Sequence, residues 1–541
     1  MAGFRVAVIG AGISGAFFSD FLRGLANESR VSIDVYESSA RRGGRALDTT
    51  AFGETADLAV DVGAAMYIEQ NHYMAASAAS LGLETVSRAT TTKGRSRLLV
   101  LGSEGTPVFT EAAFSAQSMY RMASRFGLRD LKRLTNRGRE FITNFSRLYG
   151  VQQRGEAFES VEALLESAGM ADVPRMSCTD AVGRALSSAS SNAATELVSA
   201  LMRNNYGQPW APAGALCCFT AVAPLAAGGS KAAYRIFGGN ARLVEALLRR
   251  SGATLHLNTT VTSVTATSRG RYILGFSRQD RGASAAPTPS KDDGSASLRT
   301  DAGSVHEASS YDYVVLAAPC PPADDLAVNS TGASPNLLSR CSRLPFQLVY
   351  TTLVHGLLDP AALGSLLTAP ELNGKFSDVL VADGAPLPFS SIGLQPSGGA
   401  GADAAAAACA AAGHAPLADG LGIPRWKIFS EHQLTADQLG RLFLCHGAGS
   451  VVRHEWAAPG AYPRSRPWAK GSGGSFVLHA SGAAGGLVLH PSAVESATSA
   501  MEVMAVAARN AALLVRQDLV RRGAADAVSP RRAAAVEKEE L

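Results

Sequence analysis

A glycine-rich turn near the start of the chain constrains the fold more than any other feature of the sequence. The apolar run 5–9 has the length of a buried strand, and apolar residues at helical spacing follow over 17–25. Between them lies Gly10-Ala11-Gly12-Ile13-Ser14-Gly15. In such a unit Gly10 permits the tight turn, Gly12 lets the backbone approach a pyrophosphate, and Gly15 lets helix and strand pack closely. The sequence therefore predicts an α/β fold with a Rossmann-like dinucleotide-binding domain.

An acidic residue and a second glycine pair narrow the choice of dinucleotide. Glu37 ends the next expected strand, 31–36, where a carboxylate would bind ribose hydroxyls and repel the 2′-phosphate of NADP. Gly43 and Gly44 would let backbone pass close to a cofactor, and Arg45 can pair with phosphate. A solvated acid and a charged turn remain the alternative interpretations. A glycine doublet followed by arginine at this place resembles the second fingerprint of the FAD amine-oxidase and GDI-like superfamily.

That resemblance implies FAD as the cofactor and a glutathione-reductase-like domain to hold it. Gly63 and Ala64 resemble the turn that faces the isoalloxazine, and Val261 stands where a strand backbone pairs with adenine. Residues 315–319 look like the strand end that passes behind the cofactor. Glu495 and Glu502 would bind ribityl hydroxyls, or would only cap and solvate the last helix.

Segments spread over the rest of the chain resemble one family of flavin enzymes, the prenylcysteine oxidases, which are also called prenylcysteine or farnesylcysteine lyases. The most specific are 201–208, which contains Met-Arg-Asn-Asn-Tyr-Gly-Gln, and 495–514. The others are 158–165, 237–240, 350–354, 390–393, 426–430, and Trp456 with Tyr462-Pro463. The resemblance extends from about residue 5 to residue 519, apart from two low-complexity insertions. One departure is the absence of a His-Pro pair near Ile68-Glu69.

The family resemblance implies an oxidase of S-prenyl-L-cysteine that acts in the degradation of prenylated proteins. With dioxygen and water, a farnesyl or geranylgeranyl thioether would give a prenyl aldehyde, free cysteine and hydrogen peroxide. Such chemistry needs flavin and a dry site rather than a nucleophile, so no catalytic side chain is predicted. Two alternatives are another flavin oxidase of amines or polyenes, and a GDI-like or Rab-escort-like binding protein. The intact Gly15 disfavours the binding protein.

A prenyl tail requires an apolar slot, for which the apolar run around 211–227 supplies candidates. We predict that Leu216, Phe219, Val222 and Leu225 line this slot. Tyr206 and Gln208 would lie nearer the head group. Ordinary core packing explains the apolar residues equally well.

The elements expected along the chain suggest an FAD-binding domain interwoven with an α+β substrate domain. Helices are expected over 128–150, after Ser160, over 243–248 and over 494–519, with a strand pair or hairpin edge at 253–264 and a strand at 313–318. The FAD-binding parts are 1–105, 236–280 and 311–330; a mainly helical segment covers 106–235, and 331–485 forms the substrate domain. A cofactor-contacting helical segment, 486–522, precedes a disordered tail, 523–541. Low complexity predicts a disordered insertion at 281–310 and a flexible loop at 397–415.

Composition excludes several partners. The net charge is only +4 and the basic residues are dispersed, so nucleic acid is not expected. Ten scattered histidines give no metal-ligand spacing, and seven cysteines at irregular spacing predict buried thiols with at most one bridge. We expect no transmembrane segment and see no signal peptide before the first strand, although the family suggests a lysosome or vacuole. Four glycosylation sequons, at Asn27, Asn144, Asn258 and Asn329, argue faintly for a secretory route. The oligomeric state is not predicted.

Overall fold

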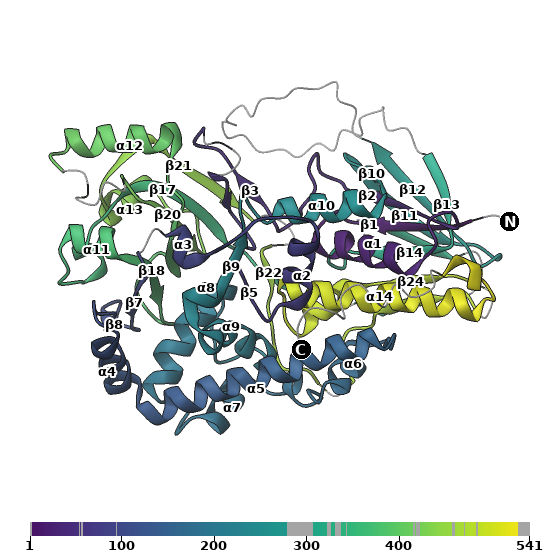
Figure 1. The fold of residues 1–541 in the computed structure, drawn as a ribbon, viewed down its shortest axis with the longest axis horizontal. Coiled ribbons are helices and arrows are strands. Elements are labelled where there is room, and N and C mark those ends of the chain that lie inside the picture. The colour runs from purple at the N-terminus through teal and green to yellow at the C-terminus, as the bar shows by residue number, and fades with distance from the viewer. Residues whose placement is uncertain are drawn as a thin grey trace, which may run out of the picture.

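The computed structural model describes residues 3–528 except 54, 56–57, 93–94, 279–306, 322–325, 331–336, 342, 415–416, 418–421, 457–459, 470 and 483–484. Two sheet-containing parts lie at opposite ends of the molecule, and a row of helices runs beneath them (Figure 1). The chain crosses between these parts several times, so neither is formed from one continuous stretch of sequence.

The dinucleotide-binding part is centred on a six-stranded sheet in the order β10-β2-β1-β14-β24-β23. Its strands are β1 (Phe4–Ile9), β2 (Val31–Tyr36), β10 (Thr254–His256), β14 (Tyr313–Leu316), β24 (Leu487–Leu489) and β23 (Val477–Ala480). The first five pair in parallel, and β23 runs antiparallel to β24. Val6, Ala7 and Val8 of the central strand are fully buried, as expected for a strand covered on both faces. The predicted strands at 5–9, 31–36 and 313–318 are confirmed, the last ending at Leu316.

The predicted strand pair at 253–264 is two strands of different sheets. β10 joins the parallel sheet, whereas β11 (Thr259–Ala266) belongs to a four-stranded sheet in the order β13-β12-β11-β15. The partners are β12 (Tyr272–Arg278), β13 (Glu307–Tyr311) and β15 (Ala327–Ser330). Asn258 makes the turn between β10 and β11 with a φ of 51°. Most of the expected disordered insertion 281–310 lies outside the described residues, but 307–310 form part of β13, so the prediction is wrong there.

Helices pack on one face of the parallel sheet, and the four-stranded sheet packs on the other. α1 (Ile13–Leu25) and α10 (Ala241–Ser251) confirm the helices expected at 17–25 and 243–248, and α2 (His72–Ser80) lies near them (Figure 1). The last helix, α14 (Met501–Arg521), begins later than the 494–519 expected, after a 3-10 helix, Pro491–Ser496. The disorder predicted for the tail 523–541 is wrong at the start of that segment, because Ala527 is buried and Val528 pairs with Ala26.

The helical row contains α4 (Ser115–Phe126), α5 (Leu128–Gln153), α6 (Val161–Ser167), α7 (Cys178–Ala185), α8 (Ser199–Tyr206) and α9 (Ala215–Ala227). The predicted helix at 128–150 and the helix after Ser160 are confirmed, and the Ser160 side chain accepts a hydrogen bond from the Ala163 N–H. Gly138 brings α5 against α9, since a Cβ there would lie 2.5 Å from Cβ of Ala226. Residues of these two helices line the cavity between the two parts of the molecule.

The second part is a seven-stranded sheet in the order β21-β17-β20-β19-β18-β7-β8. Its strands are β21 (Phe443–Glu455), β17 (Tyr350–Leu358), β20 (Arg425–Ser430), β19 (Ser391–Gln395), β18 (Phe376–Val381), β7 (Arg97–Leu101) and β8 (Pro107–Thr110). β7 falls within the stretch 1–105 that we assigned to cofactor binding, yet it pairs here. α11 (Ala369–Lys375), α12 (Gly399–Ala411) and α13 (Ala436–Leu442) flank this sheet (Figure 1).

The predicted flexible loop at 397–415 is wrong, because α12 occupies most of it. Ala is the strongest helix former, and Ala405 and Cys409 are buried against the sheet part. The expectation of at most one disulfide is also wrong. The structure pairs Cys178 with Cys218, Cys320 with Cys341 and Cys409 with Cys445. Cys217 is a buried free thiol.

Short strands connect the two parts. They are β3 (Asp48–Thr49), β4 (Val60–Asp61), β5 (Tyr67–Ile68), β6 (Thr85–Ser87), β9 (Ala233–Ile236), β16 (Phe346–Gln347) and β22 (Tyr462–Pro463). A one-turn helix, α3 (Arg88–Thr91), follows β6. Among the helices that the structure describes, none combines the length and the apolar composition needed to cross a bilayer.

Glu502 holds the start of α2 against α14. Its carboxylate accepts hydrogen bonds from the backbone N–H groups of Tyr73 (2.8 Å) and Met74 (2.9 Å) and from the Tyr149 hydroxyl (2.8 Å). Glu502 is 3% exposed, and this burial raises the pKa of its carboxyl group to about 7. A carboxylate at a helix N-terminus satisfies N–H groups that have no partner within the helix.

We therefore expect Glu502→Gln to lower the free energy of unfolding by ~1–3 kcal/mol, because the amide cannot accept all three hydrogen bonds. The folded state binds the Glu502 proton more tightly than the unfolded state does. The difference in free energy of unfolding between wild type and variant should therefore decrease as the pH rises from about 4.5 through about 7, and should be constant at higher pH. Urea unfolding of both proteins across this range measures the difference; an advantage that grows with pH would contradict the raised pKa.

Candidate active site

The first half of the site is the turn between β1 and α1. Gly10 adopts a φ of 109°, and a Cβ on it would lie 3.1 Å from the Ala317 carbonyl oxygen at the end of β14. A Cβ on Gly15 would lie 2.1 Å from the Gly10 oxygen, so this turn excludes a side chain at Gly15. Gly12 pairs with Gly43, and the Gly43 N–H donates to the Ala11 oxygen at 2.9 Å. The structure thus brings together the two glycine clusters that the sequence separates.

Glu37 binds the same turn. One of its oxygens accepts from the Ala11 N–H at 3.0 Å, and the other accepts from the Ser39 N–H at 3.0 Å. The Glu37 carbonyl accepts from the Thr259 N–H at 2.9 Å, which places the start of β11 and Val261 beside the turn. Glu37 is partly exposed, so its binding of ribose hydroxyls stays a prediction beside the solvated-acid alternative. The role of Val261 in binding adenine stays a prediction.

The residues present at this turn fit a diphosphate. The Ser14 hydroxyl is buried, with its side chain 2% exposed, and has no hydrogen-bond partner among the described residues. The first turn of α1 carries no acidic residue, and its N–H groups point out of the helix end, where a positive dipole favours an anion. A Cβ on Gly12 would meet only Gly43 and Gly44 atoms at 3.8 Å, so space remains beside it. Free donors, space and positive potential therefore coincide here.

Arg45 and Glu495, both predicted to contact the cofactor, are paired with each other. Nη2 of Arg45 lies 2.7 Å from Oε1 of Glu495, and Nη1 donates to the Ala461 oxygen at 3.3 Å. The Arg45 side chain keeps 30% of its surface exposed, whereas Glu495 is buried. The Glu502 carboxylate binds the backbone N–H groups at the start of α2. The cofactor contacts of these three residues stay predictions.

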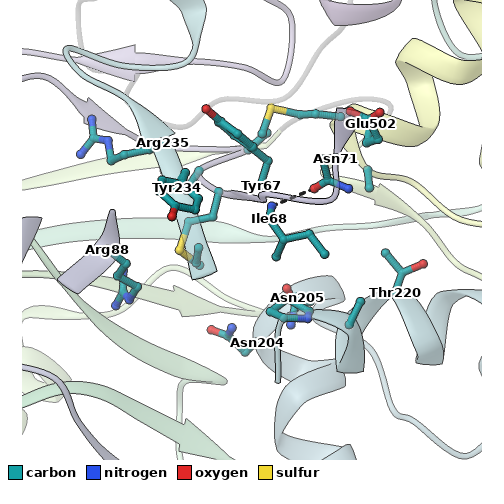
Figure 2. Close-up of a pocket in the computed structure, with 18 of the residues that line it drawn as sticks. Tyr67, Ile68, Asn71, Arg88, Asn204, Asn205, Thr220, Tyr234, Arg235 and Glu502 are labelled. Atoms are coloured by element: carbon teal, nitrogen blue, oxygen red, sulfur yellow. Dashed lines mark hydrogen bonds between the residues drawn. The ribbon is translucent and has the colours of Figure 1, made fainter. Parts of the chain in front are cut away.

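The second half of the site is a cavity of about 260 Å³ between the two parts of the molecule (Figure 2). It is lined by Gly63, Ala64, Tyr206 and Glu502 among the residues singled out from the sequence. The turn at 61–64 is fixed by Asn240, whose backbone N–H donates to Oδ1 of Asp61 and whose side-chain amide donates to the Ala64 oxygen, both at 2.8 Å. A Cβ on Gly63 would lie 2.2 Å from the Arg45 oxygen, so only glycine permits this turn.

The other predicted substrate residues do not line this cavity. Leu216, Val222 and Leu225 pack in the core or against it, and Phe219 lines a second cavity. Gln208 is 5% exposed and directs its amide toward the Cys217 sulfur. The cavity side of α9 carries Thr220, Ala223 and Pro224 instead. Because α9 is apolar on nearly every face, its sequence does not show which face meets the cavity.

One end of the cavity is polar and is formed by neighbouring residues on three strands. Asp378 of β18 is opposite Gly393 of β19, which is opposite Lys427 of β20. Arg88 lies over Gly393, where a Cβ would be 3.4 Å from its Nη2, and forms an ion pair with Asp378. The lack of a side chain at Gly393 thus creates the space that Arg88 occupies.

Lys427 is a buried cation at this polar end. It is 6% exposed, and its Nζ donates to the Asp61 carbonyl oxygen at 3.0 Å. Burial lowers the pKa of Lys427 to about 8 and raises that of Asp61 to about 6. Arg235 lies 3.3 Å from the Asp61 carboxylate, so the Asp61 charge is compensated. Figure 2 shows Arg88 and Arg235 extending from one side of the cavity.

The opposite end of the cavity is apolar. Its lining there comes from Phe141, Ile142 and Phe145 of α5 and from Ala223 and Pro224 of α9. Met66 and Ile68, which follow the 61–64 turn, and Met501 and Val503 at the start of α14 complete the wall. The cavity can therefore hold a molecule with one charged end and one long apolar end.

Sequence reasoning missed Arg88, Asp378 and Lys427. Lys427 was detectable, since a lysine within the apolar run Trp426-Lys427-Ile428-Phe429 must face a polar environment on one side of the strand. Trp426 and Ile428 indeed pack in the core on the opposite face. Arg88 and Asp378 are far apart in the sequence, and neither segment carries a comparable signal.

The model of the prenylcysteine lyase family matches residues 109–526. The chain belongs to the prenylcysteine lyase family. A second model, that of an NAD(P)-binding Rossmann-like domain, matches residues 8–79, which include both glycine clusters. Together with the fold, membership of this family implies a flavin cofactor and an oxidoreductase.

Individual relatives of this prenylcysteine lyase family member agree with that assignment. Prenylcysteine oxidase 1 of Mus musculus is 26% identical over 512 residues, covering 94% of this chain and 88% of the relative. Prenylcysteine oxidase 1-like of Homo sapiens is 27% identical over 531 residues, covering 94% and 90%. The predicted family resemblance and enzyme class are confirmed.

Solved structures show the fold alone. Cyclohexylamine oxidase from Brevibacterium oxydans IH-35A has a TM-score of 0.53 at 13% identity, covering 96% of this chain and 100% of that one. Putrescine oxidase bound to putrescine has a TM-score of 0.52 at 14% identity, covering 97% and 98%. The predicted fold class, an α/β Rossmann-like domain interwoven with a second domain, is confirmed.

The geometry at Gly12 leads to a prediction about cofactor binding. We expect Gly12→Ala to reduce bound FAD by about tenfold or more, because the new Cβ would occupy space that a pyrophosphate needs. The fold should survive, since the nearest atoms lie at the ordinary contact distance of 3.8 Å. Flavin absorbance after reconstitution and the melting temperature of the apoprotein measure the two effects. Full flavin occupancy in the variant would contradict the placement of the pyrophosphate.

Proposed function

We propose that this protein is an FAD-dependent oxidase of S-prenyl-L-cysteine. The observation that carries the proposal is the cavity with a charged end and an apolar end beside the Gly63-Ala64 turn. A prenylcysteine has the same division, with a zwitterionic amino acid at one end of a thioether and an isoprenoid at the other. In the reaction, prenylcysteine, dioxygen and water give prenyl aldehyde, cysteine and hydrogen peroxide.

FAD, when bound with its diphosphate at the α1 turn, would accept a hydride from the carbon bonded to sulfur and pass both electrons to dioxygen. The residues of the chain provide position and environment. Ala64 carries only a methyl group, so a substrate carbon can approach closely along this turn. The apolar side chains of α5 and α9 limit the access of water to the thioether, apart from the water that the reaction consumes.

The polar end would hold the amino acid. Arg88 and Lys427 are cations that can bind the α-carboxylate, and the Asp378 carboxylate can accept from the α-ammonium group. Arg88 presents several N–H donors, so it can pair with Asp378 and with a substrate carboxylate together. This orientation places the thioether between the ends, next to the turn, and directs the prenyl chain toward α5 and α9.

The test of this function is a product assay with the purified, FAD-loaded protein. Farnesylcysteine should yield hydrogen peroxide, farnesal and cysteine in equal amounts. Putrescine and cyclohexylamine serve as comparison substrates, because the same fold occurs in oxidases of those amines. Oxidation of the amines without oxidation of any prenylcysteine would move the activity to the amine-oxidase class. Absence of bound flavin, together with no turnover of either class, would favour the GDI-like binding protein.

The polar end generates a prediction about substrate affinity. We expect Arg88→Leu to raise the KM for farnesylcysteine by about tenfold or more, since a hydrogen bond to a charged group contributes ~1.5–3 kcal/mol. The KM for farnesyl ethyl sulfide, which lacks the amino acid charges, should stay within about twofold. Arg249→Leu, at an exposed arginine of α10, is the matched control. An equal loss for both substrates would show that Arg88 only supports the fold.

The reacting bond generates a second prediction. Deuterium at the carbon bonded to sulfur should slow reduction of the flavin, because that C–H bond breaks before the C–S bond. Only one of the two hydrogens should show the effect, since the bound substrate presents one face. Stopped-flow absorbance with the two stereospecifically labelled substrates measures this. Release of cysteine together with a prenyl diene, without flavin reduction, would instead indicate a lyase that uses no redox step.

A further inference from the structure

A second cavity lies directly behind the apolar end of the first. It has a volume of about 220 Å³ and lies between α5, α7 and the 3-10 helix Val173–Arg175. Its apolar lining is Met170, Val173, Met176, Ala181, Phe141 and Phe219. Charged side chains line its outer part. Arg137 and Glu140 are exposed there and form an ion pair, with Nη1 of Arg137 2.6 Å from Oε2 of Glu140. The cavity is therefore apolar inside and charged where it meets solvent.

Two phenylalanines separate the cavities, and we call them the aromatic wall. Phe141 lines both cavities, and Phe219 lines the second. Their rings stack with centroids 6.0 Å apart and an interplanar angle of 28°. Each residue is 9% exposed. On α9, the residue after Phe219 is Thr220, which lines the first cavity, so this helix also borders both spaces.

The wall is thin because α5 and α9 approach closely. Gly138, three residues before Phe141, is the position where a Cβ would lie 2.5 Å from Ala226. The aromatic wall consequently separates the two cavities with one pair of rings, and aromatic side chains can change rotamer without moving the helices.

We propose that the second cavity is a subsite for the distal isoprene units of long prenyl chains, with the aromatic wall as its gate. This inference rests on the proposed function and adds a chain-length preference to it. A prenyl chain that starts at the thioether and passes Phe145 and Ile142 reaches Phe141 at the end of the first cavity. A longer chain must displace that ring or leave the protein. The methionines beyond it offer an adaptable apolar surface suited to a branched, flexible chain.

The experiment fills the second cavity and leaves the first unchanged. Val173→Trp places a large ring in the subsite, and Val520→Trp makes the same substitution at a half-exposed position of α14. Geranylcysteine, farnesylcysteine and geranylgeranylcysteine are compared by kcat/KM. We expect Val173→Trp to lower kcat/KM for geranylgeranylcysteine by about tenfold or more, because each misplaced methylene in an apolar pocket costs ~10-fold or more. Geranylcysteine should change by less than about twofold, and Val520→Trp should change neither.

Affinity gives a readout that does not depend on turnover. The oxygen ethers of the same three prenyl chains, in which oxygen replaces the thioether sulfur, serve as ligands, and calorimetry gives their dissociation constants. Val173→Trp should weaken binding of the geranylgeranyl ether by about tenfold or more and leave binding of the geranyl ether within about twofold. Met176→Trp fills the subsite from another side and replaces Val173→Trp if that variant does not fold.

The activity of the wild type and of the Trp variants on the three substrates tests the second-cavity subsite separately from the proposed oxidase function. If the wild type oxidises all three substrates and neither Trp variant discriminates among them, the second cavity is not a subsite, whereas the proposed function stands. The subsite is also excluded if the wild type oxidises geranylcysteine but rejects geranylgeranylcysteine. If the wild type oxidises none of the three, the proposed function itself fails.

Discussion

The burial of α14 is the constraint on which the rest of the molecule depends. A buried helix must satisfy its polar side chains internally, and α14 carries three of them at eight-residue intervals: Glu502, Asn510 and Asp518. Each binds a different element. Glu502 binds the start of α2, Asn510 binds both backbone groups of Phe158 at 2.8 and 2.9 Å, and Asp518 accepts from the Tyr313 hydroxyl at 2.7 Å.

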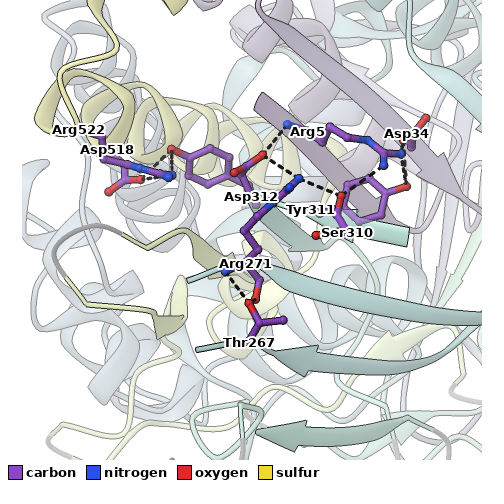
Figure 3. Close-up of polar contacts among 10 residues, drawn as sticks. Arg5, Asp34, Thr267, Arg271, Ser310, Tyr311, Asp312, Asp518 and Arg522 are labelled. Carbon is purple, nitrogen blue, oxygen red and sulfur yellow. Dashed lines mark hydrogen bonds and ion pairs between the residues drawn. The ribbon is translucent and has the colours of Figure 1, made fainter. Parts of the chain in front are cut away.

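Asp518 also connects α14 to β14, an interior strand of the parallel sheet: Asp518 and Arg522 contact the Tyr313 hydroxyl at the start of β14. In the same polar network (Figure 3), Arg5 pairs with Asp34 at 3.0 Å and its backbone N–H donates to Asp312 at 2.9 Å. β1, β2 and β14 are thereby joined at the end of the sheet opposite the glycine turn. The opposite end of the sheet carries the α1 turn, which is shaped by glycine sterics and by the Glu37 carboxylate. The cofactor site thus lies at the end of the strands away from this polar network.

The cavity obtains its polarity from the two units that meet there. The seven-stranded sheet supplies the charged end through Asp378, Gly393 and Lys427, whereas α5 and α9 supply the apolar end. Burying these charges is costly unless they are compensated. The Asp378 carboxylate pairs with Arg88, the Asp61 carboxylate pairs with Arg235, and Lys427 donates to the backbone carbonyl oxygen of Asp61. A compensated but still buried set of charges can exchange a protein partner for a zwitterionic ligand at small cost.

Local patterns were predictable from the sequence, and pairings between distant segments were not. The glycine turn and Glu37 could be assigned because steric rules act within a few residues there. The helix at 399–411 was missed because low complexity was given more weight than the helix propensity of alanine. Lys427 and Asp378 become neighbours only through strand register across β19, and the cysteine pairs depend on the same long-range packing. The sequence of α9 did not show which face of the helix lines the cavity, because apolar residues occur on nearly every face.

The strand order of the parallel sheet has a consequence for biosynthesis. β1 lies between β2 and β14, and β14 in turn needs β24, so the sheet is assembled from residues 4 to 489, and α14 follows later still. The ribosome therefore synthesises β1 long before β14 and β24. Until those strands are made, the apolar surface of the N-terminal segment stays exposed. Contacts of such long sequence separation slow folding and favour aggregation while the chain waits. Chaperone dependence and late capture of the nucleotide should accordingly accompany production of this chain, and C-terminal truncation should abolish the dinucleotide site although every glycine of that site lies near the N-terminus.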